Sequence, residues 1–291
     1  MKYMAVAVTM FLLQTSAGVY AQRHTVSPVS QFYRNGFLWN PALAGSNGKT
    51  HVYAFLNSGL TGFDGAPRVY GVAADAHFGN YSAAGLQVLS DKAGVLQRYT
   101  VTGTYAYQVK LDETQSIRIG ANLTYYKQQL DNSAAVNNGQ VDPNIKNFNG
   151  RGGYFDGDLG VTYENGQLEL GATAYNLRSE VQSKQADMDG QGLAQLQCAY
   201  TIPLDDEKIM TLKPLVAYKA FQHVSGVVTG AVQFEYNHLF HTSLYWQNPG
   251  TIMGGAGVML EELGELNFFY SNTSRYVHMA QYEVGIKINI Q

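Results

Sequence analysis

The sequence predicts an all-β fold, a transmembrane antiparallel up-and-down β-barrel of about 14 strands with long outer loops and short periplasmic turns. Three observations predict it: segments in which apolar and polar residues alternate, connections that alternate between short and long, and a composition poor in charge. Only 14% of the 291 residues are charged, whereas a typical soluble domain has about 25%. The 31 Gly and 21 Tyr residues fit a membrane barrel, and they also fit a soluble β-protein.

The N-terminus, residues 1–21, has the features of a secretory signal peptide. Lys2 precedes an apolar stretch at 4–13, and residues 19–21 approximate an A-x-A cleavage site. We expect cleavage before Gln22. A mature chain that begins at Met1 on N-terminal sequencing would contradict this.

Beyond this leader, we assign residues 22–48 to an N-terminal periplasmic or plug segment and 49–291 to the barrel. No later apolar run approaches the ~20 residues that a membrane helix needs. Export normally brings paired cysteines, but Cys198 is the only cysteine, so no intrachain disulfide is possible. A closed hydrogen-bonded sheet would hold such a chain together without disulfides.

Strand-like alternation of apolar and polar residues is the main fold signal. It is clearest at 99–110, 117–125, 168–174, 228–237 and 281–290. Most of these segments are longer than the usual strand of about five or six residues and approach the length that crosses a bilayer at a tilt. Counting all such segments places strands near residues 53, 72, 86, 104, 121, 159, 172, 197, 215, 232, 244, 257, 268 and 283. The first and twelfth of them do not divide cleanly into two faces.

The connections between these segments alternate in length. The even-numbered connections are tight and fall at 79–80, 112–114, 164–166, 204–207, 238–240 and 261–264. The odd-numbered connections include long loops at 59–65, 130–153 and 178–190. An up-and-down barrel has short periplasmic turns and longer outer loops, so we expect both termini to be periplasmic in the outer membrane.

The two faces of the strands differ in chemistry. The apolar face is expected to meet lipid, because an Arg or Lys at the bilayer midplane costs about 2–4 kcal/mol on that face. The other face carries Asp75, Asp156, Asp158, Glu169, Glu235 and Glu283 with Arg118, Lys213, Lys219 and Lys287. Cys198 falls on the apolar face beside Leu196, where it acts as a small hydrophobe without a redox role. Pro214 interrupts a strand, and we expect a bulge there.

A search for catalytic chemistry finds little. The motifs G-x-S-x-G, H-E-x-x-H and the P-loop are absent from the sequence. His238 and His241 are the closest histidine pair, but they flank a predicted turn without apparent Cys or carboxylate ligands. The run Asp187-Met188-Asp189-Gly190 matches only the start of a calcium loop. We therefore expect no catalytic residue, metal or cofactor, and without a basic patch no nucleic acid partner.

Five short motifs follow one another in the first half of the chain. They are Asn40-Pro41-Ala42-Leu43-Ala44-Gly45, Gly62-Phe63-Asp64-Gly65-Ala66-Pro67, Ser90-Asp91-Lys92-Ala93-Gly94, Tyr105-Ala106-Tyr107 and Asp142-Pro143. In this order and spacing they resemble the PorP/SprF family of Bacteroidota outer-membrane proteins of the type IX secretion system. The resemblance is dense from about residue 31 to 178 and thinner towards the C-terminus.

The resemblance implies a non-enzymatic barrel of the type IX secretion and gliding motility apparatus. Its implied partners are periplasmic ring proteins, or the C-terminal domain of a secreted cargo held at the cell surface, together with outer-membrane lipid. Candidate interaction or plug residues are Trp39, Asn40, Pro41, Gly45, Gly62, Phe63, Asp64, Gly65, Pro67, Asp91, Asp142 and Pro143.

Two interpretations of these motifs stay open at this point. In the first, the segments at 40–45 and 62–67 are turns that shape the barrel entrance and a surface loop. In the second, residues 39–45 enter the barrel as a plug, and 62–67 with 130–153 form an outer docking surface. A barrel of this size is wider than the eight-stranded size that side chains alone fill. A diffusion channel or small-solute transporter is the alternative function, and a barrel with surface enzymatic activity is a third.

Overall fold

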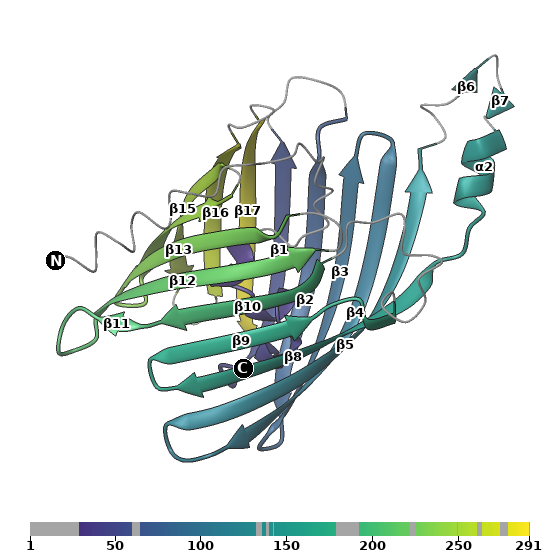
Figure 1. The fold of residues 1–291 in the computed structure, drawn as a ribbon. Coiled ribbons are helices and arrows are strands. Elements are labelled where there is room, and N and C mark those ends of the chain that lie inside the picture. Colours follow the sequence, from purple (N-terminus) through teal and green to yellow (C-terminus); the bar gives the residue numbers. More distant parts are fainter. Residues whose placement is uncertain are drawn as a thin grey trace.

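The fold is a closed antiparallel barrel, shown in Figure 1. The computed structural model describes residues 29–59, 65–131, 136–137, 140–141, 143–178, 192–221, 225–248, 250–260, 264–273 and 279–290. The 14 wall strands are β1 (Thr50–Gly59), β2 (Arg68–Phe78), β3 (Ser82–Ala93), β4 (Leu96–Lys110), β5 (Gln115–Leu130), β8 (Tyr154–Asn165), β9 (Leu168–Ala174), β10 (Gly192–Tyr200), β12 (Met210–Phe221), β13 (Val227–Tyr236), β14 (Phe240–Gln247), β15 (Thr251–Leu260), β16 (Gly264–Thr273) and β17 (Met279–Ile290). The predicted fold class is confirmed.

Each wall strand pairs with its neighbours in sequence, and the first strand closes the ring with the last. β1 and β17 pair from Thr50 opposite Ile290 to Gly59 opposite Gln281. The short strand β11 (Ile202–Pro203) continues β10 and also pairs with β12. Because the sheet closes on itself, every wall strand has partners on both sides.

The even-numbered connections lie together at one end of the barrel, which we call the turn end. They are 79–81, 111–114, 166–167, 204–209, 237–239 and 261–263. The three longest connections, 60–67, 131–153 and 175–191, follow odd-numbered strands and therefore belong to the opposite end, the loop end. The predicted alternation is confirmed. The 131–153 connection also contains β6 (Val136–Asn137), β7 (Gln140–Val141) and α2 (Pro143–Asn149), which the sequence pattern did not reveal.

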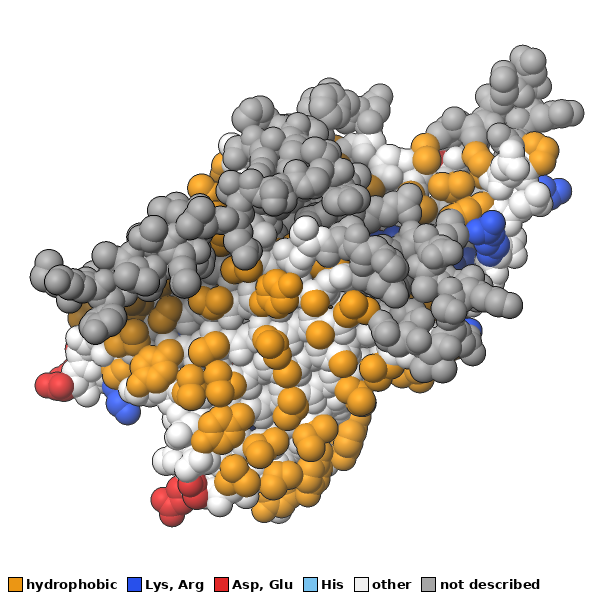
Figure 2. All heavy atoms as spheres, in the orientation of Figure 1, with side chains coloured by type: hydrophobic (Ala, Val, Ile, Leu, Met, Phe, Trp, Pro, Cys, Tyr) orange, Lys and Arg blue, Asp and Glu red, His pale blue; other side chains and the backbone are white. Residues whose placement is uncertain are grey.

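The outer face of the wall is apolar. Leu123, Leu196 and Val216 are each about 60% exposed, while their strand neighbours Thr124 and Gln195 are buried inside the ring. Figure 2 shows hydrophobic side chains spread over this face, with acidic side chains at its left and lower margins. This is the division that lipid outside and a polar lumen inside require.

The only cysteine, Cys198, is exposed on the same apolar face, as expected. Among the described residues, no helix is long and apolar enough to cross a membrane.

The predicted bulge at Pro214 is wrong. β12 pairs with β13 in a constant register that places Pro214 opposite Val232. The irregularity lies in the neighbouring strand instead, where β10 ends at Tyr200 and β11 begins at Ile202, next to the Ala199–Leu215 pair. Because proline has no N–H to donate, the ladder breaks here without gaining a residue.

Candidate functional site

Residues 29–48, which we call the lumen segment, run through the ring of strands: 29–45 lie inside it (the purple coil within the barrel in Figure 1), and Asn47 and Gly48 are exposed. The segment folds into three short 3₁₀ turns, η1 (Val29–Phe32), η2 (Gly36–Leu38) and η3 (Pro41–Leu43). Asn40 caps η3, because its side chain accepts a hydrogen bond from the Ala42 amide. Pro41 then takes the first position of the turn, where a missing N–H costs nothing. Such compact turns let a short segment fill a wide lumen.

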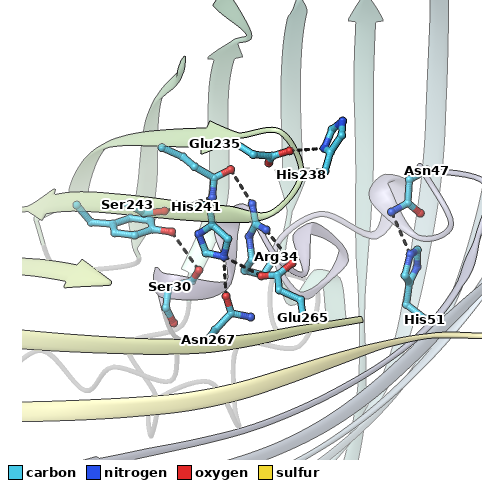
Figure 3. Close-up of polar contacts among 12 residues, drawn as sticks. Ser30, Arg34, Asn47, His51, Glu235, His238, His241, Ser243, Glu265 and Asn267 are labelled. Carbon is cyan, nitrogen blue, oxygen red and sulfur yellow. Dashed lines mark hydrogen bonds and ion pairs between the residues drawn. The ribbon is translucent and has the colours of Figure 1, made fainter. Parts of the chain in front are cut away.

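One end of the lumen segment is held by an ion pair. The Arg34 guanidinium donates to Glu265 of β16 at 2.8 Å and to the side-chain oxygen of Gln233 on β13 at 2.6 Å. Figure 3 shows this contact and the neighbouring polar groups. Both charges are shielded from solvent, since the Arg34 side chain is 9% exposed and that of Glu265 is 3%. A charge buried this way is costly unless its partner is present, so the pair fixes the segment to the wall.

The two histidines of the predicted turn lie in different surroundings (Figure 3). His241 is fully buried in the lumen, with Nε2 2.9 Å from Glu265 and 2.8 Å from the Asn267 side-chain oxygen. The expectation that no carboxylate lies near this pair is therefore wrong, because β16 brings Glu265 alongside. His238 points outward and contacts Glu235 at 2.6 Å. Among the described residues no group of three His, Cys, Asp or Glu side chains could hold a metal ion.

Glu283 of β17 forms a second anchor close to the first. Its Oε1 accepts hydrogen bonds from Ser30 Oγ at 2.5 Å and Gln31 Nε2 at 2.6 Å. Its other oxygen accepts from Asn57 Nδ2 of β1 at 3.1 Å. The side chain is 1% exposed. These three hydrogen bonds tie the segment to the β1–β17 seam.

Tyr33 and Tyr245 add two further contacts at this end. The Tyr33 hydroxyl donates to the Lys213 carbonyl oxygen at 2.7 Å, and the Tyr245 hydroxyl donates to the Ser30 carbonyl oxygen at 3.1 Å. Burial raises the pKa of the Tyr33 phenol well above its usual range. It therefore stays protonated and keeps its donor role.

The other end of the lumen segment is bound by Asn40. Its Nδ2 donates to the Val161 carbonyl oxygen and to Thr162 Oγ1, both at 3.1 Å. The carbonyl oxygen of the preceding residue, Trp39, accepts from the Tyr175 hydroxyl at 2.5 Å. Asn40 is completely buried. Its single side chain thus caps a turn of the segment and bonds the wall strand β8.

The segment then leaves the lumen through Gly45. Its amide donates to Asp75 Oδ2 at 2.6 Å, and its φ of +60° is one that glycine adopts without strain. The Ser46 carbonyl oxygen accepts from Arg118 at 2.9 Å. Beyond it, Asn47 contacts His51 on β1 at 3.2 Å, as Figure 3 shows.

The lumen contains its own apolar core. Phe32 and Trp39 stack with their ring centroids 4.0 Å apart. They pack against Ala199, Leu215, Ala217, Tyr245, Met253 and Phe269 of the wall. A second cluster joins Phe37 and Ala44 to Tyr53, Ala73, Ala83 and Ala106. This explains why the first and twelfth strands, β1 and β15, do not divide cleanly into faces: Tyr53 and Met253 point inward to meet the segment.

Trp39, Asn40, Pro41 and Gly45 are thus brought together in the lumen, whereas other candidate residues lie at the loop end. The Gly65 carbonyl oxygen accepts from the Gly94 amide at 3.0 Å. Gly65 is exposed, Pro67 and Asp91 are half-buried, and Pro143 begins α2. Gly62, Phe63, Asp64 and Asp142 lie outside the described residues, as do the predicted signal peptide and the run at 187–190.

Sequence reasoning missed Arg34 and Glu265, which form the ion pair of the lumen segment. Glu283 was placed correctly on the polar face, but its partners Ser30 and Gln31 were not foreseen. The available signal was the position of Arg34, the only charged residue between Arg23 and Lys49 apart from His24 when protonated. A lone charge in an otherwise apolar and amide-rich segment needs a buried partner.

A polar hollow of about 660 Å³ opens at the turn end. It is lined by residues of the β4–β5 and β8–β9 turns, among them Lys110, Glu113 and Gln167, and by Lys213 of β12. Arg118 lies between this hollow and the lumen segment, since its guanidinium contacts both Gln108 of the lining (3.1 Å) and the Ser46 carbonyl oxygen (2.9 Å). Arg118 therefore links the lining of the hollow to the lumen segment.

The closed sheet, its apolar outer face and its polar lumen define an outer-membrane β-barrel protein. Solved barrels share this fold. The chain is similar to the CymD monoaromatic hydrocarbon channel (TM-score 0.59, 12% identity, covering 93% of this chain and 99% of CymD). It is also similar to the toluene transporter TbuX of Ralstonia pickettii (0.56, 11%, covering 88% and 93%) and to Omp33 of Acinetobacter baumannii (0.52, 7%, covering 83% and 98%). At these identities the likeness concerns the fold alone.

The family is shown by the sequence. The profile of the type IX secretion system membrane protein PorP/SprF matches residues 21–285. The chain belongs to this family, and the resemblance stated from its motifs is confirmed. Among curated proteins, none matches the chain.

Proposed function

We propose that this chain is a non-enzymatic outer-membrane barrel of the type IX secretion apparatus that binds partner proteins and does not conduct solutes. The observation that carries the proposal is the lumen segment, which occupies the space a solute would need. Family membership supports the secretion role, and the absence of the common catalytic motifs from the sequence supports a non-enzyme.

The partner in this proposal is the C-terminal domain of a secreted cargo, the periplasmic ring proteins, or both. We assign the turn end to the periplasm, because outer-membrane barrels carry short turns there and longer loops outside. Both chain termini are then periplasmic, after removal of the signal peptide at 1–21. The turn end and its hollow face the ring proteins, and the loop end faces the cargo that it anchors at the cell surface.

The loop end has a continuous rim that suits a docking role. Gly65 of the β1–β2 loop contacts Gly94 of the β3–β4 turn. The next residue of that turn, Val95, accepts a hydrogen bond from the Asp131 amide at 2.7 Å. Three connections thus join side by side, and two of the motifs shared with the family, at 62–67 and 90–94, meet there. We propose that this rim, together with residues 142–143, contacts the cargo during secretion and gliding.

A diffusion channel or small-solute transporter is the second candidate. It is favoured by the fold it shares with CymD and TbuX, a hydrocarbon channel and a toluene transporter. The buried anchors of the lumen segment count against it, because a transport path would have to displace a charged pair and several hydrogen bonds.

Affinity purification from native outer membranes separates the two candidates. We expect a secreted C-terminal domain or a ring protein to copurify with the wild-type chain. A variant lacking residues 136–141, which belong to the loop end, should recover less of the secreted domain and as much of the ring protein. The purified wild-type barrel is expected to show no steady conductance in planar bilayers. A barrel that purifies alone and conducts ions steadily would overturn the proposal and support the channel.

A further inference from the structure

The wall strands around the Asn40-Pro41-Ala42 turn contain glycine at three inward positions. Gly120 of β5 is paired with Gly160 of β8 across the sheet. Gly171 of β9 pairs with Thr162 of β8. Their neighbours Ile119, Leu159 and Leu170 point outward and are exposed on the lipid face. The three glycines therefore face the lumen, at adjoining places in the wall.

The lumen segment occupies the space that side chains would take at these positions. A Cβ on Gly160 would lie 2.1 Å from Asn40 Oδ1 and 2.8 Å from Pro41 Cδ. A Cβ on Gly120 would lie 2.3 Å from the Pro41 carbonyl carbon and 2.4 Å from the Ala42 nitrogen. Contacts below 3.0 Å are not tolerated, and at Gly120 the obstructing atoms are backbone, which cannot rotate away.

Polar contacts make this surface specific for the turn that it holds. Asn40 donates to the Val161 carbonyl oxygen and Thr162 Oγ1, which follow Gly160 on β8. The same side chain accepts from the Ala42 amide at 3.0 Å and so fixes the turn in the shape that fits. A Cβ on Gly171 would meet Gln197 of the neighbouring wall strand at 2.8 Å and Asn40 Nδ2 at 3.1 Å. Shape and hydrogen bonding therefore select an asparagine side chain at the position of Asn40, beside Gly160.

We propose that Gly120, Gly160 and Gly171 form a binding seat for an Asn-Pro-Ala turn, and that the barrel is a latent pore closed by the chain's own turn in this seat. The ligand class is a peptide with this turn, and residues 40–42 supply it here. Beside the two apolar clusters, the wall that the segment covers carries buried polar side chains, among them Thr162, which accepts from Asn40, and Asp75, which accepts from the Gly45 amide. A barrel whose seat is blocked would therefore open these polar groups to water. The inference does not depend on which partner the barrel binds.

The test uses the full chain with a cysteine reporter in the lumen segment. Asn35→Cys is suitable, because Asn35 is fully buried and its side chain forms no hydrogen bond within the described residues. Cys198→Ala removes the only native thiol. We call this double variant the parent. Gly160→Val, which blocks the seat, is added to the parent, and Gly103→Val is added to it separately as the matched control. Gly103 also lies within a wall strand, but a Cβ there meets nothing within 4 Å.

We expect a water-soluble maleimide to label the thiol introduced by Asn35→Cys slowly in the parent and in Gly103→Val. In Gly160→Val we expect labelling to be at least about tenfold faster, because local opening exposes the segment without unfolding the barrel. Gly160→Val should also conduct ions in planar bilayers, whereas the parent and Gly103→Val stay closed. The shift in gel mobility on heating serves as the folding check for every variant.

A second variant keeps the test decisive if Gly160→Val does not fold. Asn40→Ala leaves the wall unchanged and removes the hydrogen bonds to β8, so faster labelling is expected there as well. If Gly160→Val and Asn40→Ala both fold and protect the introduced thiol as well as the parent does, the proposed binding seat is wrong. If labelling is fast but no conductance is seen, the proposal of a latent pore is wrong.

Discussion

At the scale of single residues, the lumen depends on buried carboxylates that bind the lumen segment. Glu283 accepts three hydrogen bonds, two of them from Ser30 and Gln31, although it is 1% exposed. Glu265 plays the same part for Arg34 at 2.8 Å. A buried donor left without an acceptor costs about 1–3 kcal/mol, so each of these carboxylates carries more of the stability than an exposed one.

We therefore predict that Glu283→Leu destabilises the barrel by about 1–3 kcal/mol or more, because it leaves the buried donors of Ser30 and Gln31 without an acceptor. The measurement is the temperature at which the compact band on a gel converts to the unfolded band. Glu207→Leu, an exposed residue of the turn at 204–209, serves as the control and should leave this temperature unchanged. Equal melting of the two variants would show that the segment is not held through Glu283.

At this scale the sequence could identify which side of a strand Glu283 occupies, because alternation fixes the face. It could not identify Ser30 and Gln31 as its partners. They are 253 and 252 residues away, and no periodicity links a wall strand to a segment outside the sheet. The same limit applies to His241, whose carboxylate neighbour Glu265 comes from another strand.

At the scale of elements, the turns of the turn end are set by local hydrogen bonds. In the β4–β5 turn, Asp112 accepts from the Thr114 amide at 2.7 Å and from the Gln115 amide at 2.7 Å. The hydrogen bond from the Thr114 amide is the main reason why the pKa of Asp112 is lowered. A carboxyl with a lowered pKa favours the folded state while it is ionised, and this contribution disappears as the pH falls through the folded-state pKa.

We predict a pH-dependent effect of Asp112→Ala. Near neutral pH the variant should melt at a lower temperature than the wild type, because the ionised Asp112 binds the turn amides. The gap should narrow as the pH falls below about 4, the ordinary pKa of an Asp carboxyl, and should close below the lowered pKa of the folded state. Glu113→Ala controls for the loss of a neighbouring charge. A gap that is equally wide at neutral and strongly acidic pH would contradict the account.

Elements of the wall were largely predictable, whereas elements outside it were not. The strands and tight turns follow from alternation and turn residues alone. The small helix α2 did not stand out, because it is short and is held by a tertiary contact: Asn149 accepts from the Leu130 amide at 2.7 Å and donates to the Leu130 carbonyl oxygen at 2.9 Å. The two strands that do not divide cleanly into a polar and an apolar face are β1 and β15. Their inward side chains Tyr53 and Met253 are themselves apolar, because they pack against the lumen segment.

At the scale of the whole molecule, the apolar belt gives the barrel its place in a bilayer. Leu123 lies in the middle of the long strand β5, with Gly157 and Gly103 as its neighbours across the sheet. It is 61% exposed, the largest value among the exposed large hydrophobic side chains of the described residues. Side chains at such a position face the centre of the hydrocarbon, where charge is least tolerated.

We predict that Leu123→Arg impairs membrane insertion at a cost of about 2–4 kcal/mol, the range for a charge at the bilayer midplane. Leu204→Arg is the matched control. Leu204 is also exposed, at 49%, but it lies in a turn at the turn end, where the cost is about 0–1 kcal/mol. Folding into lipid vesicles, followed by gel mobility, measures both. Equal folding yields would argue against a lipid-facing belt.

The connections between the lumen segment and the last strands also impose an order in time. Ser30, Gln31 and Arg34 reach β16 and β17 across 231 to 253 residues of chain, and contacts so remote in sequence form slowly. The same segment runs directly into β1, which must meet β17 for the ring to close. A segment enclosed by the barrel has to be in place before β1 pairs with β17. We therefore expect the wall to assemble around the lumen segment. The pairing of β16 and β17 should then close the barrel and form the contacts of the segment in one step.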